Sequence, residues 1–422
     1  MKRYEHYLPV SNLLTNEIPS HWEMKRNRVF LRPKFVSVGQ DPNKYPLLSL
    51  TTNGIIYRDV ESGKGKFPKD FDTYQVVEPN DIVFCLFDVD ETPRTVGLSA
   101  LNGMLTGAYD AFSIADSANP RFINYYYTAV DDIKALRPYY TGLRKVVKKD
   151  KFMAISIPLP PINEQEKIVA YLDRQINLIE SCKAQKENEL KALNELRRAI
   201  IAEAVTHGLD SSAPLKDSGI PWIGQIPAHW TLMRIKNLLE ESKVKSIDGH
   251  EQSLSLSKTA GVIPYEEKEN RTMQSESLVG AKVVKCGDVV FNRFKARLFA
   301  ISNYDGVVSP DYAVYNGKGR ANLNYLVFLF GTEMYRAAFD RKASGIGDGF
   351  SRLYTADLFS MYAIFPPIEE QKEIVKYIAL KTNQIDSMIQ ALKAEIDHLT
   401  EYKQRLISDV ITGQLNVQDE IA

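Results

Sequence analysis

Two long stretches of the sequence, residues 162–206 and 368–412, repeat apolar residues in alternating steps of three and four positions. Neither stretch contains a proline. This spacing places one narrow apolar seam along a helix and is typical of coiled coils. The seam positions are Val169, Leu172, Ile176, Ile179, Leu190 and Leu193 in the first stretch, and Val375, Ile378, Ile385, Ile389, Leu392, Ile396 and Leu399 in the second. Polar residues interrupt the seams at Lys183, Lys186, Arg197, Thr382 and Lys403.

Each predicted helix needs a partner, because a narrow apolar seam is not stable when it faces water. The pairs Pro160-Pro161 and Pro366-Pro367 precede the two stretches and favour a helix start there. We expect the two helices of one chain to pack on each other as an antiparallel pair, with a globular part at either end. An intermolecular coiled coil that joins two copies of the chain is the alternative.

The rest of the sequence alternates short β-branched and aromatic runs with Gly, Asp and Asn turns, which is typical of short strands. Residues 81–87 and 281–285 fit strands, whereas residues 326–335 favour a helix. We therefore predict an α+β protein. Its predicted segments are a globular domain at 1–161, a first helix at 162–206, a second globular domain at 207–365, and a second helix with the C-terminal tail at 366–422.

The two halves of the chain repeat each other. Ile18-Pro19-Ser20-His21-Trp22 recurs as Ile226-Pro227-Ala228-His229-Trp230, an offset of 208 (226 − 18). Pro160-Pro161-Ile162-Asn163-Glu164-Gln165 recurs as Pro366-Pro367-Ile368-Glu369-Glu370-Gln371, an offset of 206 (366 − 160). A nearly constant offset predicts two duplicated α/β globular domains, separated by the antiparallel pair of long coiled-coil helices and related by a pseudo-two-fold axis.

The chain has 422 residues, and its 53 Lys and Arg balance 53 Asp and Glu. This balance excludes a polybasic tail or a purely electrostatic coat for nucleic acid, although it allows local basic surfaces. The three cysteines are far apart and indicate neither a zinc site nor a disulfide framework. No apolar run is long enough to cross a membrane and no signal peptide is visible, so we expect a cytoplasmic protein.

Basic residues gather in a few loops of both predicted globular domains. Residues 144–151 hold five cations in eight positions, and Arg293, Lys295 and Arg297 alternate around Phe294. Such groups suit duplex DNA, because cations neutralise phosphates and arginine reaches base edges. A single cluster is more often a solvated surface patch, but two matched domains with basic loops favour DNA. The candidate DNA-binding residues are Lys64, Lys66, Lys69, Arg144, Lys145, Lys148, Lys149, Arg293, Lys295, Arg297 and Arg352.

Motifs for catalysis are missing from the sequence. It contains no Asn-Pro-Pro-Tyr or Asp-Pro-Pro-Tyr box for amine methylation, and residues 63–66 lack the spacing of a phosphate-binding loop. The six histidines show no metal-ligand spacing. His21 and His229 repeat beside Trp22 and Trp230, and we interpret them as structural anchors. We expect neither catalytic residues nor a cofactor or metal site in this chain.

Several motifs together resemble a known family. They are the segment from Lys216 to Trp230, the segment Gly287-Asp288-Val289-Val290-Phe291-Asn292-Arg293, the segment Val308-Ser309-Pro310-Asp311-Tyr312-Ala313-Val314, both Pro-Pro-Ile-x-Glu-Gln helix starts, and the tails 204–208 and 410–413. In this combination, over nearly the whole chain, the sequence resembles the DNA specificity subunit of type I restriction-modification systems. The first half departs from the pattern, since residues 106–112 stand where the second half has Ser309-Pro310-Asp311-Tyr312.

The resemblance implies two target-recognition domains, at 1–161 and 207–365, that each read one half of a bipartite asymmetric site in double-stranded DNA. The paired helices would set the length of the unread spacer and dock two modification subunits. Those partners bind S-adenosylmethionine and methylate adenine, and restriction subunits that use ATP and Mg²⁺ join for cleavage. The chain itself would be non-catalytic. A duplicated coiled-coil scaffold that joins protein partners without DNA recognition is the alternative.

Overall fold

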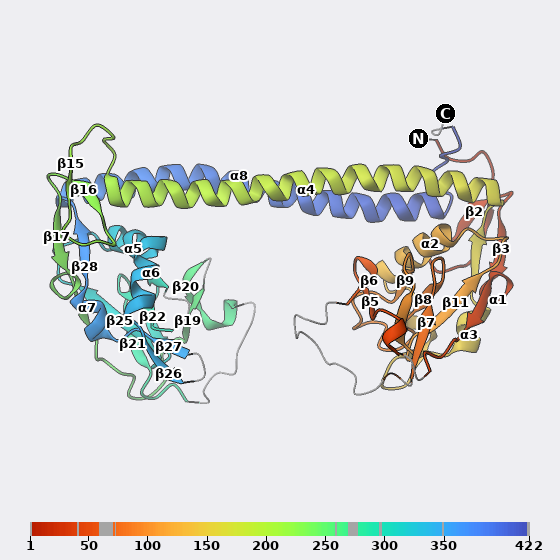
Figure 1. Ribbon diagram of the computed structural model, residues 1–422, viewed down its shortest axis with the longest axis horizontal. Coiled ribbons are helices and arrows are strands. Elements are labelled where there is room, and N and C mark those ends of the chain that lie inside the picture. The colour runs from red at the N-terminus through yellow and green to blue at the C-terminus, as the bar shows by residue number, and fades with distance from the viewer. Residues whose placement is uncertain are drawn as a thin grey trace. The chain divides into compact units, whose positions relative to one another are not determined.

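The computed structural model describes residues 2–39, 42–58, 71, 73–257, 260–268, 277–294, 298–347 and 350–419. The chain forms two compact units (Figure 1). Unit 1 comprises Met1–Glu187 and Ala394–Ala422, and unit 2 comprises Asn188–Lys393. Each unit contains a part of both long helices. The units therefore do not coincide with the four predicted segments, whose boundaries stay a prediction.

The two long helices are α4 (Ile162–His207) and α8 (Ile368–Ile411), and in each unit they lie side by side (Figure 1). In unit 1, Lys403 Nζ lies 2.7 Å from Glu180 Oε1, and Lys186 bonds Glu395. The residue numbers of α8 fall as those of α4 rise, so the two helices run antiparallel. Each long helix thus finds a partner within the same chain, as expected.

The predicted seam positions are shielded from solvent along both long helices. In the sequence they were defined only by their spacing; in the structure each of them is buried or half-buried. The polar seam residues Lys186, Arg197 and Lys403 are each paired with an acid of the other helix, as in the contact of Arg197 Nε with Asp386 Oδ1 at 2.9 Å. These cross-helix pairs explain how a cation is tolerated on an otherwise apolar seam.

Each unit is built on an antiparallel four-stranded sheet with the same strand order. In unit 1 the order is β4 (Leu31–Lys34), β11 (Asp110–Ile114), β8 (Ile82–Phe84) and β9 (Val96–Leu98). In unit 2 it is β18 (Leu239–Glu241), β25 (Tyr312–Gly317), β22 (Val289–Asn292) and β23 (Phe299–Ile301). The repeat seen in the sequence is therefore a repeat of topology, and the predicted duplication is confirmed.

The two-stranded ladders of the units also correspond, and all of them are antiparallel. Unit 1 contains β1 (Tyr7–Pro9) with β2 (Glu17–Pro19), β3 (Glu23–Arg26) with β14 (Ser156–Leu159), β5 (Leu48–Thr51) with β6 (Gly54–Tyr57), β7 (Tyr74–Val77) with β10 (Gly103–Thr106), and β12 (Tyr140–Thr141) with β13 (Val146–Val147). Unit 2 contains β15 (Leu215–Asp217) with β16 (Gln225–Pro227), β17 (Thr231–Arg234) with β28 (Tyr362–Phe365), β19 (Leu254–Ser257) with β20 (Gly261–Pro264), β21 (Lys282–Val284) with β24 (Gly306–Val308), and β26 (Ser344–Gly347) with β27 (Phe350–Arg352).

Helices cover one edge of each sheet. In unit 1, α2 (Pro120–Asp132) packs on β9, and in unit 2, α5 (Leu323–Gly331) packs on β23. Both helices begin at an asparagine cap, Asn119 or Asn322, whose side chain accepts main-chain hydrogen bonds from the first turn. The remaining helices are α1 (Asn27–Phe30), α3 (Lys149–Ala154), α6 (Glu333–Lys342) and α7 (Thr355–Ser360), with short 3-10 turns at Pro42–Lys44, Arg137–Tyr139, Ile235–Asn237 and Tyr265–Glu267.

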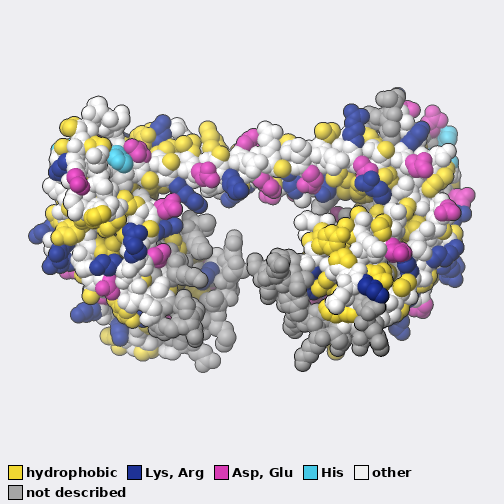
Figure 2. Space-filling model, viewed as in Figure 1, with side chains coloured by type: hydrophobic (Ala, Val, Ile, Leu, Met, Phe, Trp, Pro, Cys, Tyr) yellow, Lys and Arg dark blue, Asp and Glu magenta, His cyan; other side chains and the backbone are white. Residues whose placement is uncertain are grey.

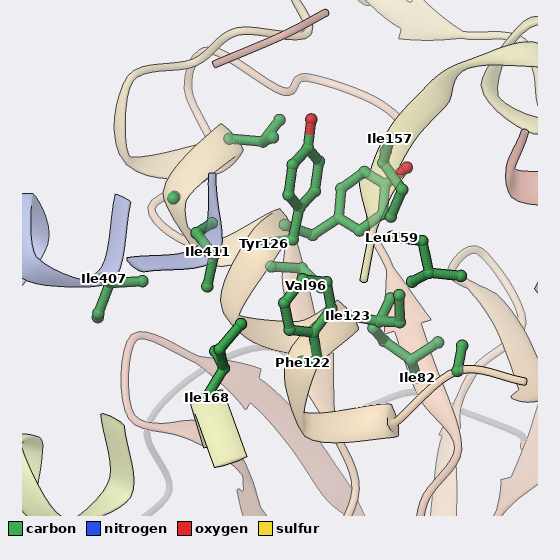
Figure 3. Close-up of a cluster of buried hydrophobic side chains, with 14 of the residues drawn as sticks. Ile82, Val96, Phe122, Ile123, Tyr126, Ile157, Leu159, Ile168, Ile407 and Ile411 are labelled. Carbon is green, nitrogen blue, oxygen red and sulfur yellow. The ribbon is translucent and has the colours of Figure 1, made fainter. Parts of the chain in front are cut away.

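The ends of the long helices are part of the hydrophobic cores. In unit 1, Phe122 and Tyr126 of α2 pack with Ile168 of α4 and with Ile407 and Ile411 of α8 (Figure 3). The core of unit 2 likewise joins residues of α4 and α8 to the aromatic side chains of α5. The helix pair therefore shares the largest hydrophobic cluster of each unit, and a shared core of this kind makes for a rigid attachment.

The repeated sequence motifs form a similar latch in both units, built on one histidine–glutamate contact. In unit 1, His21 Nε2 lies 2.9 Å from Glu164 Oε2, and the Trp22 indole donates to Glu164 Oε1 at 3.1 Å. In unit 2, His229 Nε2 lies 2.9 Å from Glu370 Oε2. The two histidines thus tie the entrance of each globular part to the first turn of a long helix, which is the structural role predicted for them.

A glutamine completes the latch. The Gln165 side chain donates to the carbonyl oxygen of Pro160 at 2.7 Å and accepts from the amide of Asn119 at 2.7 Å. Gln371 makes the equivalent bonds to Pro366 and Asn322, at 2.8 and 2.9 Å. One buried side chain therefore joins the start of a long helix to the cap of α2 or α5, which explains why the motif contains a glutamine.

Candidate nucleic-acid interface

The predicted DNA-binding residues divide into those the structure describes and those it does not. Lys64, Lys66, Lys69, Lys295 and Arg297 lie outside the described residues. The others belong to loops and strands of both units. On the face shown in Figure 2, Lys and Arg side chains are interspersed with Asp and Glu over both units. Whether a cation is available to a DNA phosphate or base therefore depends on its own neighbours more than on the number of cations in the unit.

In unit 1 the cations Arg144 and Lys145 lie in the tight loop of the β12–β13 hairpin. The loop turns through two residues with left-handed backbone, Gly142 at a φ of 79° and Lys145 at a φ of 44°. Main-chain hydrogen bonds fasten the hairpin to the segment after β8, from the amide of Val147 to the oxygen of Leu86 and from the amide of Asp88 to the oxygen of Arg144, both 2.8 Å. The hairpin is thus held against the four-stranded sheet.

Acidic residues of the neighbouring loop compensate these cations. Arg144 lies 3.4 Å from an Asp88 carboxylate oxygen, and Lys145 lies 3.1 Å from Glu91 and 3.5 Å from Asp90. The hydrogen bond with Glu91 raises the pKa of Lys145 above its ordinary value. A phosphate at this loop would have to compete with three carboxylates, so a purely electrostatic role is weakened.

The next two cations of unit 1 flank the start of α3. Lys149 Nζ lies 2.9 Å from Asp110 Oδ1 and 5.3 Å from the centroid of the Phe112 ring. Lys148 is exposed and immediately precedes the helix, and the described part of the chain shows no ion pair for it. Lys148 is therefore the cation of this group best placed to meet a phosphate.

In unit 2, Arg293 is largely buried, with 11% of its side chain exposed. Its guanidinium bonds the Glu241 carboxylate and lies 3.3 Å from Thr355 Oγ1, while Lys282 approaches the same carboxylate at 3.4 Å. Burial opposes ionisation of Glu241, but the Thr355 hydrogen bond and the charges of Arg293 and Lys282 hold its pKa below the ordinary value. Arg293 is thus part of a buried charge network, and its role in DNA binding stays a prediction.

Arg352 lies over aromatic rings, in contrast to Arg293, which bonds a carboxylate. Its guanidinium carbon is 5.3 Å from the centroid of the Phe294 ring and 5.5 Å from that of Tyr354. Its Nε is buried and finds no hydrogen-bond partner among the described residues. The hairpin that carries Arg352 is fastened to the segment that directly follows β22, since the amide of Leu353 donates to the oxygen of Arg293 at 2.9 Å. Among the described residues, two aromatic rings are thus the contacts that orient the Arg352 guanidinium.

The sequence interpretation missed the aromatic partners of these arginines. In unit 1, the guanidinium carbon of Arg144 lies 5.3 Å from the centroid of the Phe87 ring. Phe87 and Phe294 each stand three residues after the repeated Asp-x-x-Phe of β8 and β22, at an offset of 207 (294 − 87). That recurrence was the available signal, but only the fold brings the hairpin arginines to the rings.

Other kinds of site find no support in the described residues. No described group of three or more His, Cys, Asp or Glu side chains is arranged to hold a metal ion. None of the described helices combines the length and apolar character that a membrane crossing requires. Both units present loops that combine arginine or lysine with aromatic side chains.

Comparison with known proteins matches the predicted resemblance. A sequence model of the type I restriction modification DNA specificity domain matches residues 37–192. The chain is 24% identical over 307 residues to the type I restriction enzyme MjaVIII specificity subunit of Methanocaldococcus jannaschii, covering 66% of this chain and 66% of that protein. It is 22% identical over 287 residues to the type I restriction enzyme EcoKI specificity subunit of Escherichia coli K12, covering 64% of this chain and 60% of that protein. The matches span less than two thirds of these relatives' own length.

The fold is also similar to a solved structure. A chain from a structure described as the structural basis underlying complex assembly and conformational transition of the type I R-M system aligns with 94% of this chain and 99% of its own length. The TM-score is 0.67 at 16% identity. This likeness concerns the fold, and it confirms the predicted α+β architecture with two long helices.

Proposed function

We propose that this chain is the DNA specificity subunit of a type I restriction-modification complex. Each unit would carry one target-recognition domain, 1–161 or 207–365, and read one half of a bipartite site in double-stranded DNA. The observation that carries the proposal is the repeat of one sheet topology in two units whose loops differ in sequence and charge. Two readers of the same fold with unlike loops suit an asymmetric site.

The long helices would set the distance between the two half-sites. Helix α4 has 46 residues and α8 has 44. At about 1.5 Å per residue each helix is roughly 65–70 Å long. Because the helix ends are built into the cores of the units, a change in helix length would be transmitted to the readers.

The outer faces of the helices would dock two modification subunits. The seam of the pair is closed by the helices themselves, which leaves their flanks for partner proteins. Methylation of adenine with S-adenosylmethionine would belong to the modification subunits, and cleavage with ATP and Mg²⁺ to restriction subunits. The specificity subunit itself would be non-catalytic, acting within a cytoplasmic assembly.

The test is to map methylated adenines in DNA from cells that express this chain with its modification subunits. We expect methylation at one bipartite asymmetric sequence with a spacer of fixed length. The control omits this chain and should lose methylation of that sequence. Duplex binding by the purified complex should also weaken steeply with salt, as phosphate contacts release counterions. A salt slope near zero together with unselective methylation would favour the protein scaffold instead.

A further inference from the structure

Each unit has an arginine whose guanidinium lies over a phenylalanine ring. In unit 1 the pair is Phe87 and Arg144, and in unit 2 it is Phe294 and Arg352; in both, the guanidinium carbon lies 5.3 Å from the ring centroid. Both rings follow a central strand of the four-stranded sheet, β8 or β22. Both arginines belong to a hairpin, β12–β13 or β26–β27, that is fastened beside that strand.

The two phenylalanines are equivalent positions of the repeat. The residue before Phe87 is Leu86, whose main-chain oxygen accepts from Val147 at 2.8 Å. The residue before Phe294 is Arg293, whose main-chain oxygen accepts from Leu353 at 2.9 Å. The same hydrogen bond therefore docks the hairpin beside the ring in both units.

The two arginines, in contrast, are not equivalent positions. In the hairpin registers Val146 pairs with Thr141, and Arg352 pairs with Ser344. Because each of these residues directly precedes the docking residue, Arg352 corresponds to Val146, while Arg144 lies two residues earlier in the loop. The two arginines thus reach equivalent rings from different backbone positions. Duplication of the backbone alone does not explain why both units have this contact.

A ring beneath the guanidinium fixes the plane in which its donors point. Arginine stacks on aromatic faces and offers a planar fork of N–H groups at its edge. Guanine presents N7 and O6 as two neighbouring acceptors in the major groove, and a bidentate arginine is their usual partner. A cation that has to contact only phosphate needs no such orientation, since phosphate contacts carry no sequence information.

The surroundings of the two pairs differ. In unit 1, 73% of the Arg144 side chain is exposed, Asp88 lies 3.4 Å away, and the Phe87 ring stacks on Tyr109 with centroids 6.0 Å apart. In unit 2, Arg352 lies against two rings, and its buried Nε has no hydrogen-bond partner among the described residues. Beside Arg144 of unit 1 lies the Asp88 carboxylate, and beside Arg352 of unit 2 lies the second ring, Tyr354.

We propose that Phe87–Arg144 and Phe294–Arg352 are the base-reading pairs of the two units, each directing an arginine edge to a guanine in one half of the DNA site. The inference rests on the proposed function and adds the residues and the base. The phenyl ring is the positioning group and the guanidinium makes the contact. Different neighbours would give the two pairs different preferences at the adjoining base pair.

The experiment uses the full complex with its modification subunits and a pool of DNA duplexes with randomised sequence. Arg144→Lys and Arg352→Lys keep the charge but remove the planar fork. We expect each variant to lose its preference for guanine at one position of one half-site, with discrimination there roughly 5- to 150-fold weaker. Phe87→Leu and Phe294→Leu should weaken the same positions, because the arginine edge is then no longer held in plane.

Two other arginine–aromatic pairs serve as matched controls. Arg3 lies over Tyr7 in unit 1 at 4.3 Å, and Arg234 lies over Tyr362 in unit 2 at 5.2 Å, and neither arginine belongs to the β12–β13 or β26–β27 hairpin. Arg3→Lys and Arg234→Lys should leave every base preference unchanged. The half-site read by the unaltered unit reports that a variant complex is folded and assembled.

The outcomes separate this inference from the proposed function. If the unmodified complex selects no DNA sequence, the proposed function is wrong. If it selects a bipartite site and Arg144→Lys and Arg352→Lys keep all base preferences, the base-reading pairs are wrong while the function stands. A uniform loss of affinity over all sequences would also overturn the inference and assign both arginines to phosphate contacts.

Discussion

At the scale of single residues, two arginines of unit 2 that were chosen for the same reason have different partners in the structure. Arg293 and Arg352 both belong to basic loops, and both were predicted to bind DNA. Arg293 is held by Glu241 and Thr355, whereas Arg352 rests on Phe294. Alternation along a strand indicates which side of the strand Arg293 faces. It does not reveal that Glu241, 52 positions earlier in the sequence, lies on that side and bonds the guanidinium.

Buried tyrosines make a second residue-scale feature, and one of them predicts a pH dependence of stability. Burial raises the pKa of Tyr315 to about 12, against the opposing hydrogen bond with Thr355. Because the folded pKa lies above the unfolded value of about 10, the stabilisation is complete below pH 10 and is lost as the pH rises toward 12. We expect the free energy of unfolding to fall by about 2–3 kcal/mol over this window through Tyr315.

Denaturant unfolding at pH 9 to 12 measures this contribution. Tyr315→Phe should show a shallower fall in the free energy of unfolding than the unmodified chain. Tyr402→Phe is the control, because 49% of Tyr402 is exposed and its removal should leave the pH dependence unchanged. Equal slopes for Tyr315→Phe and the unmodified chain would contradict the burial argument.

At the scale of elements, the long helices combine an apolar seam with a few specific ion pairs. An apolar seam alone fits many registers and both directions, whereas an ion pair at one position favours a single register. Arg197 and Asp386 form such a pair, with two contacts of 2.9 and 3.3 Å. The ion pairs therefore help to specify the antiparallel arrangement within one chain.

Charge reversal tests this role. Arg197→Asp sets two carboxylates against each other, and we expect the free energy of unfolding to fall by about 1 kcal/mol. Adding Asp386→Arg restores an opposite-charge pair and should recover most of the loss in denaturant unfolding. Arg198→Asp, at the neighbouring exposed position, is the control and should change little. Failure of the double variant to recover stability would mean that the pair does not act across the helices.

At the scale of the whole molecule, one chain contains two units of the same topology, the two readers of the proposed function, together with two continuous long helices. A symmetric dimer of a shorter chain would present two identical readers. A duplicated chain is free to let its loops diverge while keeping the sheet, and the different surroundings of Arg144 and Arg352 are an instance of this. The arrangement suits the asymmetric site of the proposed function.

Helix length should then set the spacer of that site. We expect four residues inserted in α4 within 190–205, with four more inserted at the facing position of α8, to lengthen each helix by about 6 Å. At about 3.4 Å per base pair the tolerated spacer should grow by one or two base pairs. Methylation mapping measures spacer and half-sites together, and a change in half-site sequence at constant spacer would refute the ruler.

The sequence by itself determined the features that depend on local periodicity and on repetition. The seam of residues such as Ile378, Ile385 and Ile389 defined the long helices, because a heptad pattern needs no knowledge of distant contacts. The recurring latch motifs indicated the duplicated layout and, with it, the family resemblance. His21 and His229 were interpreted as anchors from their position alone, and their contacts with Glu164 and Glu370 agree.

Only the tertiary structure decided which cations are paired with acids and which lie over aromatic rings. Arg144 is separated from Phe87 by 57 residues (144 − 87), and Arg352 from Phe294 by 58 (352 − 294), so neither pairing follows from local spacing. The electrostatic energy of a cation depends mainly on the groups within a few ångströms of it. Sheet order and hairpin docking determine which groups those are. A pattern of charge in the sequence therefore locates candidate loops, while the fold selects the residues within them.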